Sequence, residues 1–107
     1  MWAAMAKHER PMVVMVATLL EGYVRKLAPA KTAEQVQAIL GELQGALDDM
    51  AHASKHWSQA EFTTVMHVES DIDPFNVAGK VPPAKTHAWL TKYAARWRAK
   101  ADRLKKR

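Results

Sequence analysis

Apolar residues recur along the first part of the chain at helical spacing. They follow Pro11 at steps of three and four residues: Met12, Val16, Leu19, Tyr23 and Leu27. This spacing places them on one side of an α-helix. Proline suits the first turn of a helix, where its missing N–H is not needed, so we expect the first helix to begin at Pro11 and to end before Pro29. Residues 1–10 are then a separate N-terminal segment.

A second and longer helix is predicted from residue 33 to about residue 56. Thr32 and Gln35 form a capping box, in which each side chain accepts a hydrogen bond from the backbone N–H of the other residue. An apolar seam with alternating steps of four and three residues follows: Val36, Leu40, Leu43, Leu47 and Met50, continued in register by Ser54 and Trp57. Such a seam is typical of helices that pack in a bundle.

The stretch after Ser58 is compatible with a helix or a strand. Ser58 and Glu61 make another capping box, which favours a short helix over residues 59–69. That helix would bury Phe62, Val65 and Met66. The same stretch is rich in β-branched and aromatic residues, as strands are, although a lone strand would have no partner in the rest of the chain.

Prolines and a glycine separate this stretch from the end of the chain. We expect residues 70–84 to form a loop and residues 85–107 to form a basic amphipathic helix. This last helix has its own apolar seam: Leu90, Ala94, Trp97, Ala101 and Leu104. The elements together predict an all-α single domain over residues 1–107, a small three- to four-helix bundle with a long second helix.

Composition narrows the class of protein further. The chain has 107 residues, of which 49% are apolar and 25% are charged, as in one ordinary globular domain. Cysteine is absent, which excludes disulfides, thiolate zinc sites and cysteine nucleophiles. The longest apolar run, Met12 to Leu20, is shorter than the roughly 20 residues that cross a bilayer. We therefore expect a cytoplasmic protein with no transmembrane segment.

The charge is distributed unevenly. The net charge of the whole chain is +5. Six basic and ten acidic residues precede Gly79, a net charge of −4, whereas ten basic residues and one acidic residue follow it, a net charge of +9. The last helix is therefore the segment where acidic partners are expected to bind.

The basic residues of the last helix share one side with an aromatic ring. We call this set the basic stripe: Lys85, Trp89, Lys92, Arg96, Lys100, Arg103 and Arg107. Cations neutralise phosphates and release counterions, and planar rings stack on bases, so the stripe predicts a small non-catalytic protein that binds nucleic-acid phosphates. Trp89 is the ring expected to be available for stacking, and Trp97 is expected in the core. A solvated helix end, with cations that complement the helix dipole, is the simpler alternative.

Another interpretation is a protein–protein interaction module, such as a regulatory or inhibitory subunit. The basic stripe would then bind an acidic protein or an anionic membrane surface. Alternatively, a strip of small residues on the second helix, Ala38, Gly41 and Gly45, would allow close approach of another helix, from within the bundle or from a second copy in a homodimer. Each helical glycine costs roughly 1 kcal/mol relative to alanine, and a long helix also tolerates such residues without a use for them.

Enzyme chemistry has little support in the sequence. No nucleophile elbow, phosphate-binding glycine loop or metallohydrolase signature occurs, so we expect neither an enzyme nor a cofactor. Asp49, His52 and His56 have the spacing of a zinc or nickel site, with two histidines one turn apart and a carboxylate before them. Because such sets are common on solvent-facing helices, we expect no metal there.

Overall fold

The computed structural model describes residues 2–53, 58–76 and 81–105. Its elements are α1 (Trp2–Leu27), α2 (Ala33–Ala53), α3 (Gln59–Ile72), a short 3-10 helix η1 (Asp73–Phe75) and α4 (Pro83–Lys105). Those residues include no strand. The predicted all-α bundle is therefore confirmed.

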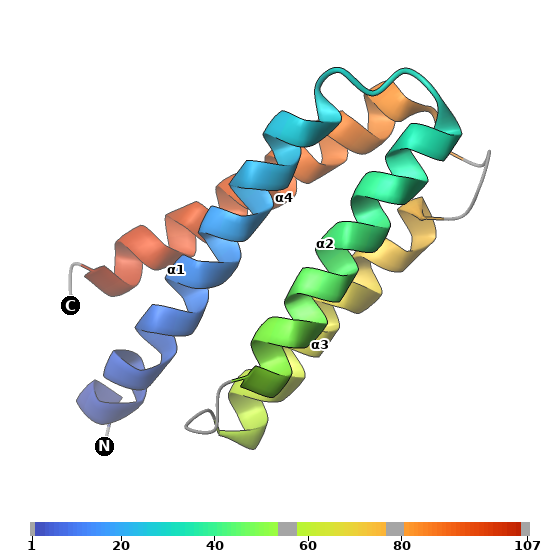
Figure 1. Cartoon of the computed structure of the whole chain (residues 1–107). Helices are drawn as coiled ribbons and strands as arrows, with labels where there is room; N and C mark the ends of the chain where they lie inside the picture. Colours follow the sequence, from blue (N-terminus) through green and yellow to red (C-terminus); the bar gives the residue numbers. More distant parts are fainter. Residues whose placement is uncertain (1, 54–57, 77–80, 106–107) are drawn as a thin grey trace.

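The helices are arranged as two antiparallel pairs (Figure 1). Helices α1 and α4 lie along one another over most of their length, which brings the two ends of the chain to the same end of the molecule. Helices α2 and α3 form a hairpin, and α2 also packs against α1. The resulting molecule is long and narrow, with extents of 47 × 26 × 17 Å.

The predicted seams form the core. On α2 the seam residues Val36, Leu40, Leu43 and Leu47 are buried and Met50 is half-buried, while Ser54 and Trp57 lie outside the described residues. On α4 the residues Leu90, Ala94 and Ala101 are buried, whereas Trp97 and Leu104 are half-buried. Over the part of the chain that is described, no helix has an apolar stretch long enough to cross a membrane.

Both predicted capping boxes are present. At α2, the Thr32 Oγ1 accepts from the Gln35 N–H at 3.1 Å and the Gln35 Oε1 accepts from the Thr32 N–H at 3.2 Å. At α3, the Ser58 Oγ accepts from the Glu61 N–H at 3.2 Å and the Glu61 Oε1 accepts from the Ser58 N–H at 3.0 Å. Residues 59–69 are thus helical, and the strand alternative is wrong.

The first helix begins earlier than predicted. Residues 1–10 were expected to form a segment of their own, but α1 begins at Trp2 and continues through Pro11. The stretch before the proline, Trp2 to Arg10, consists mainly of strong helix formers such as alanine, methionine, lysine and arginine. Inside a helix proline removes one N–H donor and its ring crowds the carbonyl four residues before it, and α1 nevertheless continues through Pro11.

The predicted loop over residues 70–84 is shorter than expected. Helix α3 extends to Ile72, which is fully buried, and η1 follows it directly. Pro74 lies in the first turn of η1 and Pro83 begins α4, both positions at which a missing N–H is tolerated. The prolines therefore start new helical turns, and residues 77–80 of the predicted loop lie outside the described residues.

Amide side chains of α2 hold the end of α3 and η1 in place. The Gln44 Nε2 donates to the Glu69 carbonyl at 3.2 Å and to the Asp73 carboxylate. The Asn76 Nδ2 donates to the Gln44 Oε1 at 2.8 Å, and the Gln37 Nε2 donates to the Asn76 carbonyl at 3.1 Å. These bonds attach η1 to α2 across a long stretch of sequence.

Replacing Gln44 tests this attachment. We expect Gln44→Ala to lower the free energy of unfolding by about 1–3 kcal/mol, because Asn76 and the end of α3 lose their partner in a part-buried site. Urea denaturation followed by circular dichroism measures the change. Gln59→Ala, at an exposed position in the first turn of α3, is the matched control and should change stability by less than about 0.5 kcal/mol. Equal losses in the two variants would contradict the role given to Gln44.

Candidate nucleic-acid interface

Helix α4 has a buried side and two polar flanks. Its buried side carries Leu90, Ala94 and Ala101, which pack into the core that α4 shares with α1. Arg98 lies on one flank and the basic stripe on the other. In the stripe, Lys85, Lys92, Arg96 and Arg103 are exposed, Trp89 and Lys100 are half-buried, and Arg107 lies outside the described residues.

Arg98 is bound within the molecule. Its Nε donates to the Glu21 Oε2 at 2.9 Å, and its Nη2 donates to the Glu21 Oε1 at 2.7 Å and to the Thr18 Oγ1 at 3.0 Å. The hydrogen bond and charge of Arg98 lower the pKa of Glu21, so that carboxylate stays ionised. This pair joins α4 to α1. It could not be predicted from local sequence patterns, because Glu21 and Arg98 are far apart in the chain.

Among the side chains that the structure describes, which begin at Met12, no carboxylate pairs with Lys85, Lys92, Arg96, Lys100 or Arg103. The ion pairs found there are Arg98 with Glu21, Lys26 with Glu42 at 3.5 Å, and His52 with Asp48. None of these pairs involves the stripe. The described acidic side chains of α2 therefore form no ion pair with the stripe.

Trp89 is packed against two other aromatic rings. Its ring stacks on Phe75 of η1, with centroids 4.2 Å apart and planes at 20°, and on Tyr93, with centroids 4.8 Å apart and planes at 16°. Such contacts stabilise the attachment of η1 to α4. Trp89 was expected to be available for stacking on a base, but its ring is half-buried and already stacked within the protein.

Tyr93 connects α4 to α3. Its hydroxyl donates to the Asp71 Oδ2 at 2.7 Å. Burial and this hydrogen bond to a carboxylate raise the pKa of Tyr93, so the phenol remains a neutral donor. On the solvent side of the ring, the Arg96 guanidinium carbon lies 5.7 Å from the ring centroid, within the range of a cation–π contact.

A hollow of about 330 Å³ lies where Tyr93 and Trp97 meet the cations of the stripe. Lys100 borders it, with its Nζ 5.4 Å from the centroid of the Trp97 ring. Trp97, expected in the core, is half-buried at this surface. The lining residues come from α3 and α4: Asp71, Tyr93, Arg96, Trp97, Lys100 and Arg103. Asp71 was not predicted as a site residue, because the sequence around it does not indicate which residues of α4 it contacts.

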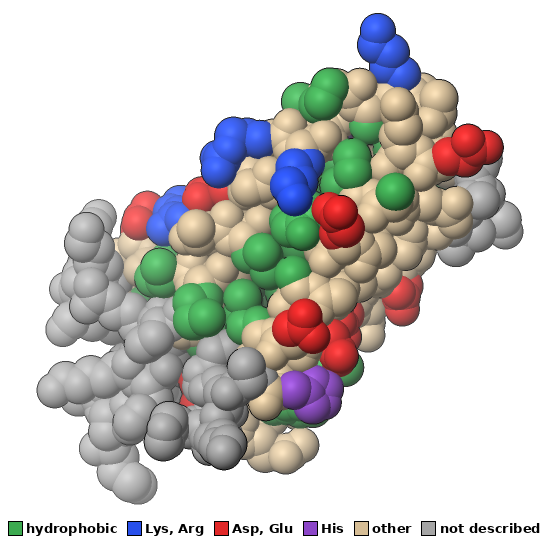
Figure 2. All heavy atoms as spheres, in the orientation of Figure 1, with side chains coloured by type: hydrophobic (Ala, Val, Ile, Leu, Met, Phe, Trp, Pro, Cys, Tyr) green, Lys and Arg blue, Asp and Glu red, His purple; other side chains and the backbone are tan. Residues whose placement is uncertain are grey.

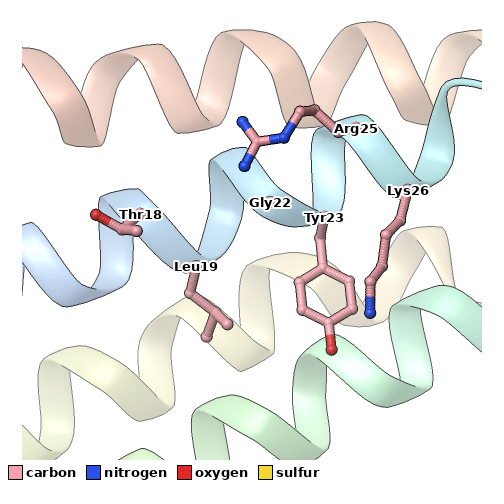
Figure 3. A pocket seen from close by; sticks show the side chains of 6 residues that line it. All are labelled: Thr18, Leu19, Gly22, Tyr23, Arg25 and Lys26. Atoms are coloured by element: carbon pink, nitrogen blue, oxygen red, sulfur yellow. The ribbon is translucent and has the colours of Figure 1, made fainter.

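A second hollow lies on α1 at Gly22. It has a volume of about 560 Å³, and the residues that line it all belong to α1 (Figure 3): Thr18, Leu19, Gly22, Tyr23, Arg25 and Lys26. Figure 3 shows Leu19 and Tyr23 pointing toward the α2–α3 hairpin and Arg25 pointing toward α4. The glycine lacks a side chain that would fill this space.

The same side of the molecule carries an apolar band. Figure 2 shows hydrophobic side chains gathered along the line where α1 and α2 meet, with acidic side chains over α2. Leu19, Tyr23 and Ile39 are half-buried in this region, and Met15 of α1 is 46% exposed. Ile39 also lines a further hollow of about 340 Å³ between the end of α1 and the start of α2.

The predicted small-residue strip lies on the outer side of α2. Ala38, Gly41 and Gly45 are all exposed. A Cβ atom built on Gly41 or on Gly45 would meet nothing within 4 Å. Within the part of the chain that the structure describes, no helix lies against these glycines, so their use for close packing inside the bundle is not found, and the homodimer alternative stays a prediction.

Of the histidine and aspartate set of α2, the structure describes Asp49 and His52. The His52 Nδ1 lies 2.8 Å from the Asp48 carbonyl oxygen, and its ring packs edge-on against Phe62. Asp49 is exposed, and His56 lies outside the described residues. Over the ranges that the structure describes, no group of three ligating side chains is close enough to hold an ion.

The pair of Glu21 and Arg98 makes stability depend on pH. Because the folded-state pKa of Glu21 is below its ordinary value of 4.5, the pair stabilises the fold above that pH, and this contribution is lost as the pH falls through the folded-state pKa. We expect Glu21→Gln to lower the urea midpoint slightly at neutral pH and to equal the wild type in acid. Asp49→Asn, at an exposed carboxylate, is the control. A deficit of Glu21→Gln that stays constant with pH would contradict this assignment.

The open surroundings of Gly45 predict a stabilising substitution. Gly45→Ala is expected to raise the free energy of unfolding by about 0.5–1 kcal/mol, because alanine loses less backbone entropy and its Cβ meets no neighbour. Ala38→Gly, on the same exposed side of α2, should lower it by a similar amount. Thermal or urea unfolding measures both variants. A destabilised Gly45→Ala variant would show instead that another helix requires the bare glycine.

Comparisons with known proteins do not supply a function. No protein-family model, curated protein or solved structure matches this chain. The two features that are most informative about function are thus the unpaired cations of α4 and the hollow beside them.

Proposed function

We propose that this chain is a small non-catalytic binding protein whose basic stripe contacts nucleic-acid phosphates, in an accessory or regulatory role. One observation carries the proposal. Lys85, Lys92, Arg96, Lys100 and Arg103 have no carboxylate partner among the side chains that the structure describes, whereas Arg98, on the opposite flank of α4, is held by Glu21. A cation that stabilises the fold has an internal partner, and a row of cations without one attracts polyanions.

The spacing of the stripe supports contacts to successive phosphates. Lys92, Arg96 and Lys100 follow at steps of four residues, which correspond to about 6 Å each along a helix that rises about 1.5 Å per residue. The flexible ends of lysine and arginine side chains adapt this spacing to a phosphate backbone. Because phosphates position a protein without specifying sequence, the stripe alone predicts little base specificity.

A protein–protein interaction module is the second candidate, and the apolar band favours it. Met15 is exposed, and the hollow at Gly22 has room for an apolar side chain of a partner. A regulatory or inhibitory subunit would use this band on a target protein. A homodimer would use either the band or the strip of Ala38, Gly41 and Gly45.

Charge reversal in the stripe tests the nucleic-acid proposal. We expect the double variant Arg96→Glu, Lys100→Glu to lose DNA and RNA binding at moderate salt, since it removes two phosphate contacts and adds repulsion. For the wild type, the logarithm of the binding constant should fall with the logarithm of salt concentration by about 0.9 per phosphate contacted on duplex DNA and about 0.7 on single strands. Fluorescence anisotropy over a salt series measures both quantities.

The control changes the net charge equally at another site. Arg25→Glu, Lys31→Glu alters two exposed cations outside the stripe and should retain most of the binding. Equal losses in both double variants would show that only net charge matters, and the absence of wild-type binding to any nucleic acid would overturn the proposal. Affinity purification that returns one stoichiometric protein, with binding reduced by Met15→Glu, would favour the second candidate.

A further inference from the structure

The hollow beside the stripe has chemically different sides. Trp97 supplies half-buried aromatic surface, and Arg96, Lys100 and Arg103 supply positive charge. Tyr93 also lines the hollow but is 9% exposed. The one acidic residue in its lining is Asp71 of α3, held in place by the hydroxyl of Tyr93 at 2.7 Å. A surface that bound phosphate alone would need neither the rings nor the carboxylate.

The aromatic surface favours an unpaired base. In a duplex each base is covered on both faces by its neighbours, so an aromatic side chain can stack only on a base that is single-stranded or flipped out. A volume of about 330 Å³ is at the lower end of the range of about 300–1,000 Å³ for small-ligand sites. The hollow therefore has room for one base and its sugar.

The charges that line the hollow determine the orientation in which a nucleotide binds. The carboxylate of Asp71 repels phosphate from its side of the hollow, while Arg96, Lys100 and Arg103 attract phosphate to theirs. The Asp71 Oδ2 already accepts from Tyr93, and no donor to the Oδ1 is found among the described residues. A free carboxylate oxygen accepts from an exocyclic amino group, such as the N4 amino group of cytosine. Thymine has no exocyclic amino group: its O4 is an acceptor, and its one donor is the ring N3–H between two carbonyl oxygens that a carboxylate repels.

We propose that this hollow binds one unpaired base that carries an exocyclic amino group. The base stacks on Trp97 and donates to Asp71, and the flanking phosphates contact Arg96, Lys100 and Arg103. This inference rests on the proposed function and adds to it a preference for single strands over duplexes and for cytosine over thymine.

The test compares labelled oligonucleotides of equal length by fluorescence anisotropy at neutral pH and one salt concentration. The strands are oligo(dC), oligo(dT), the RNA counterpart oligo(C), and a duplex of mixed sequence. We expect oligo(dC) to bind about tenfold more tightly than oligo(dT), the effect of one hydrogen bond, and both single strands to bind more tightly than the duplex. The RNA strand shows whether the preference for cytosine holds with either sugar.

Asp71→Asn separates recognition of the base from a structural role. The amide keeps an acceptor for Tyr93 but lacks the charge, so we expect the preference for oligo(dC) over oligo(dT) to disappear while the affinity for oligo(dT) is unchanged or increases. If Asp71 had a purely structural role, the substitution would lower the affinities for oligo(dC) and oligo(dT) equally. Trp97→Leu should weaken the binding of single strands at least fivefold, because stacking on one base contributes about 1–3 kcal/mol. The affinity for the duplex should be unchanged.

The possible failures are distinguishable. If the wild type binds no nucleic acid, the proposed function fails, and this inference fails with it. If the wild type binds but treats single strands and the duplex alike, or oligo(dC) and oligo(dT) alike, the inference is overturned while the proposed function stands. Because Asp71 is exposed, Asp71→Asn remains a usable variant if Trp97→Leu does not fold.

Discussion

Leu90, Ala94 and Ala101 are buried where α4 packs along α1, and this contact determines which other side chains of α4 reach the solvent. The period of an α-helix fixes the angles between its side chains. Once the apolar seam of α4 packs against the core, the positions of its other side chains around the helix axis are therefore determined. Arg98 then lies beside Glu21, and the basic stripe lies on the opposite flank. Of the cations of α4, Arg98 therefore joins the helix to α1, and those of the basic stripe face the solvent.

The candidate site depends on a second packing event, between α3 and α2. Gln44 and Asn76 hold η1 against α2, and this places Phe75 and Asp71 next to α4. Of the stacked rings Phe75, Trp89 and Tyr93, Tyr93 lines the hollow, together with Trp97. Amides on α2, which touch neither the hollow nor the stripe, are therefore positioning residues for the site.

The two halves of the molecule have separate electrostatic roles. The acidic residues that precede Gly79 give that part a net charge of −4, and the part after it has a net charge of +9. Asp71 is the acidic residue that lines the hollow, where it accepts a hydrogen bond from Tyr93. The hollow is thus lined by cations and by one carboxylate, so its two sides differ in charge.

Local sequence determined the class of the fold and the position of most helices. The seams of α2 and α4 and the capping boxes at Thr32 and Ser58 are short-range patterns, so they could be predicted, and the structure confirms them. Predictions at the ends of helices were less successful, because helix formers outweighed Pro11 and the buried Ile72 prolonged α3.

The site itself was decided by tertiary structure. The sequence placed seven residues in the basic stripe by their period alone, but it could not show that Trp89 stacks on Phe75 and that Trp97 borders the hollow instead. Nor could it show that Asp71 approaches Tyr93. Helical periodicity determines how residues of one helix are placed relative to one another, whereas contacts between helices depend on how their apolar faces fit together in three dimensions.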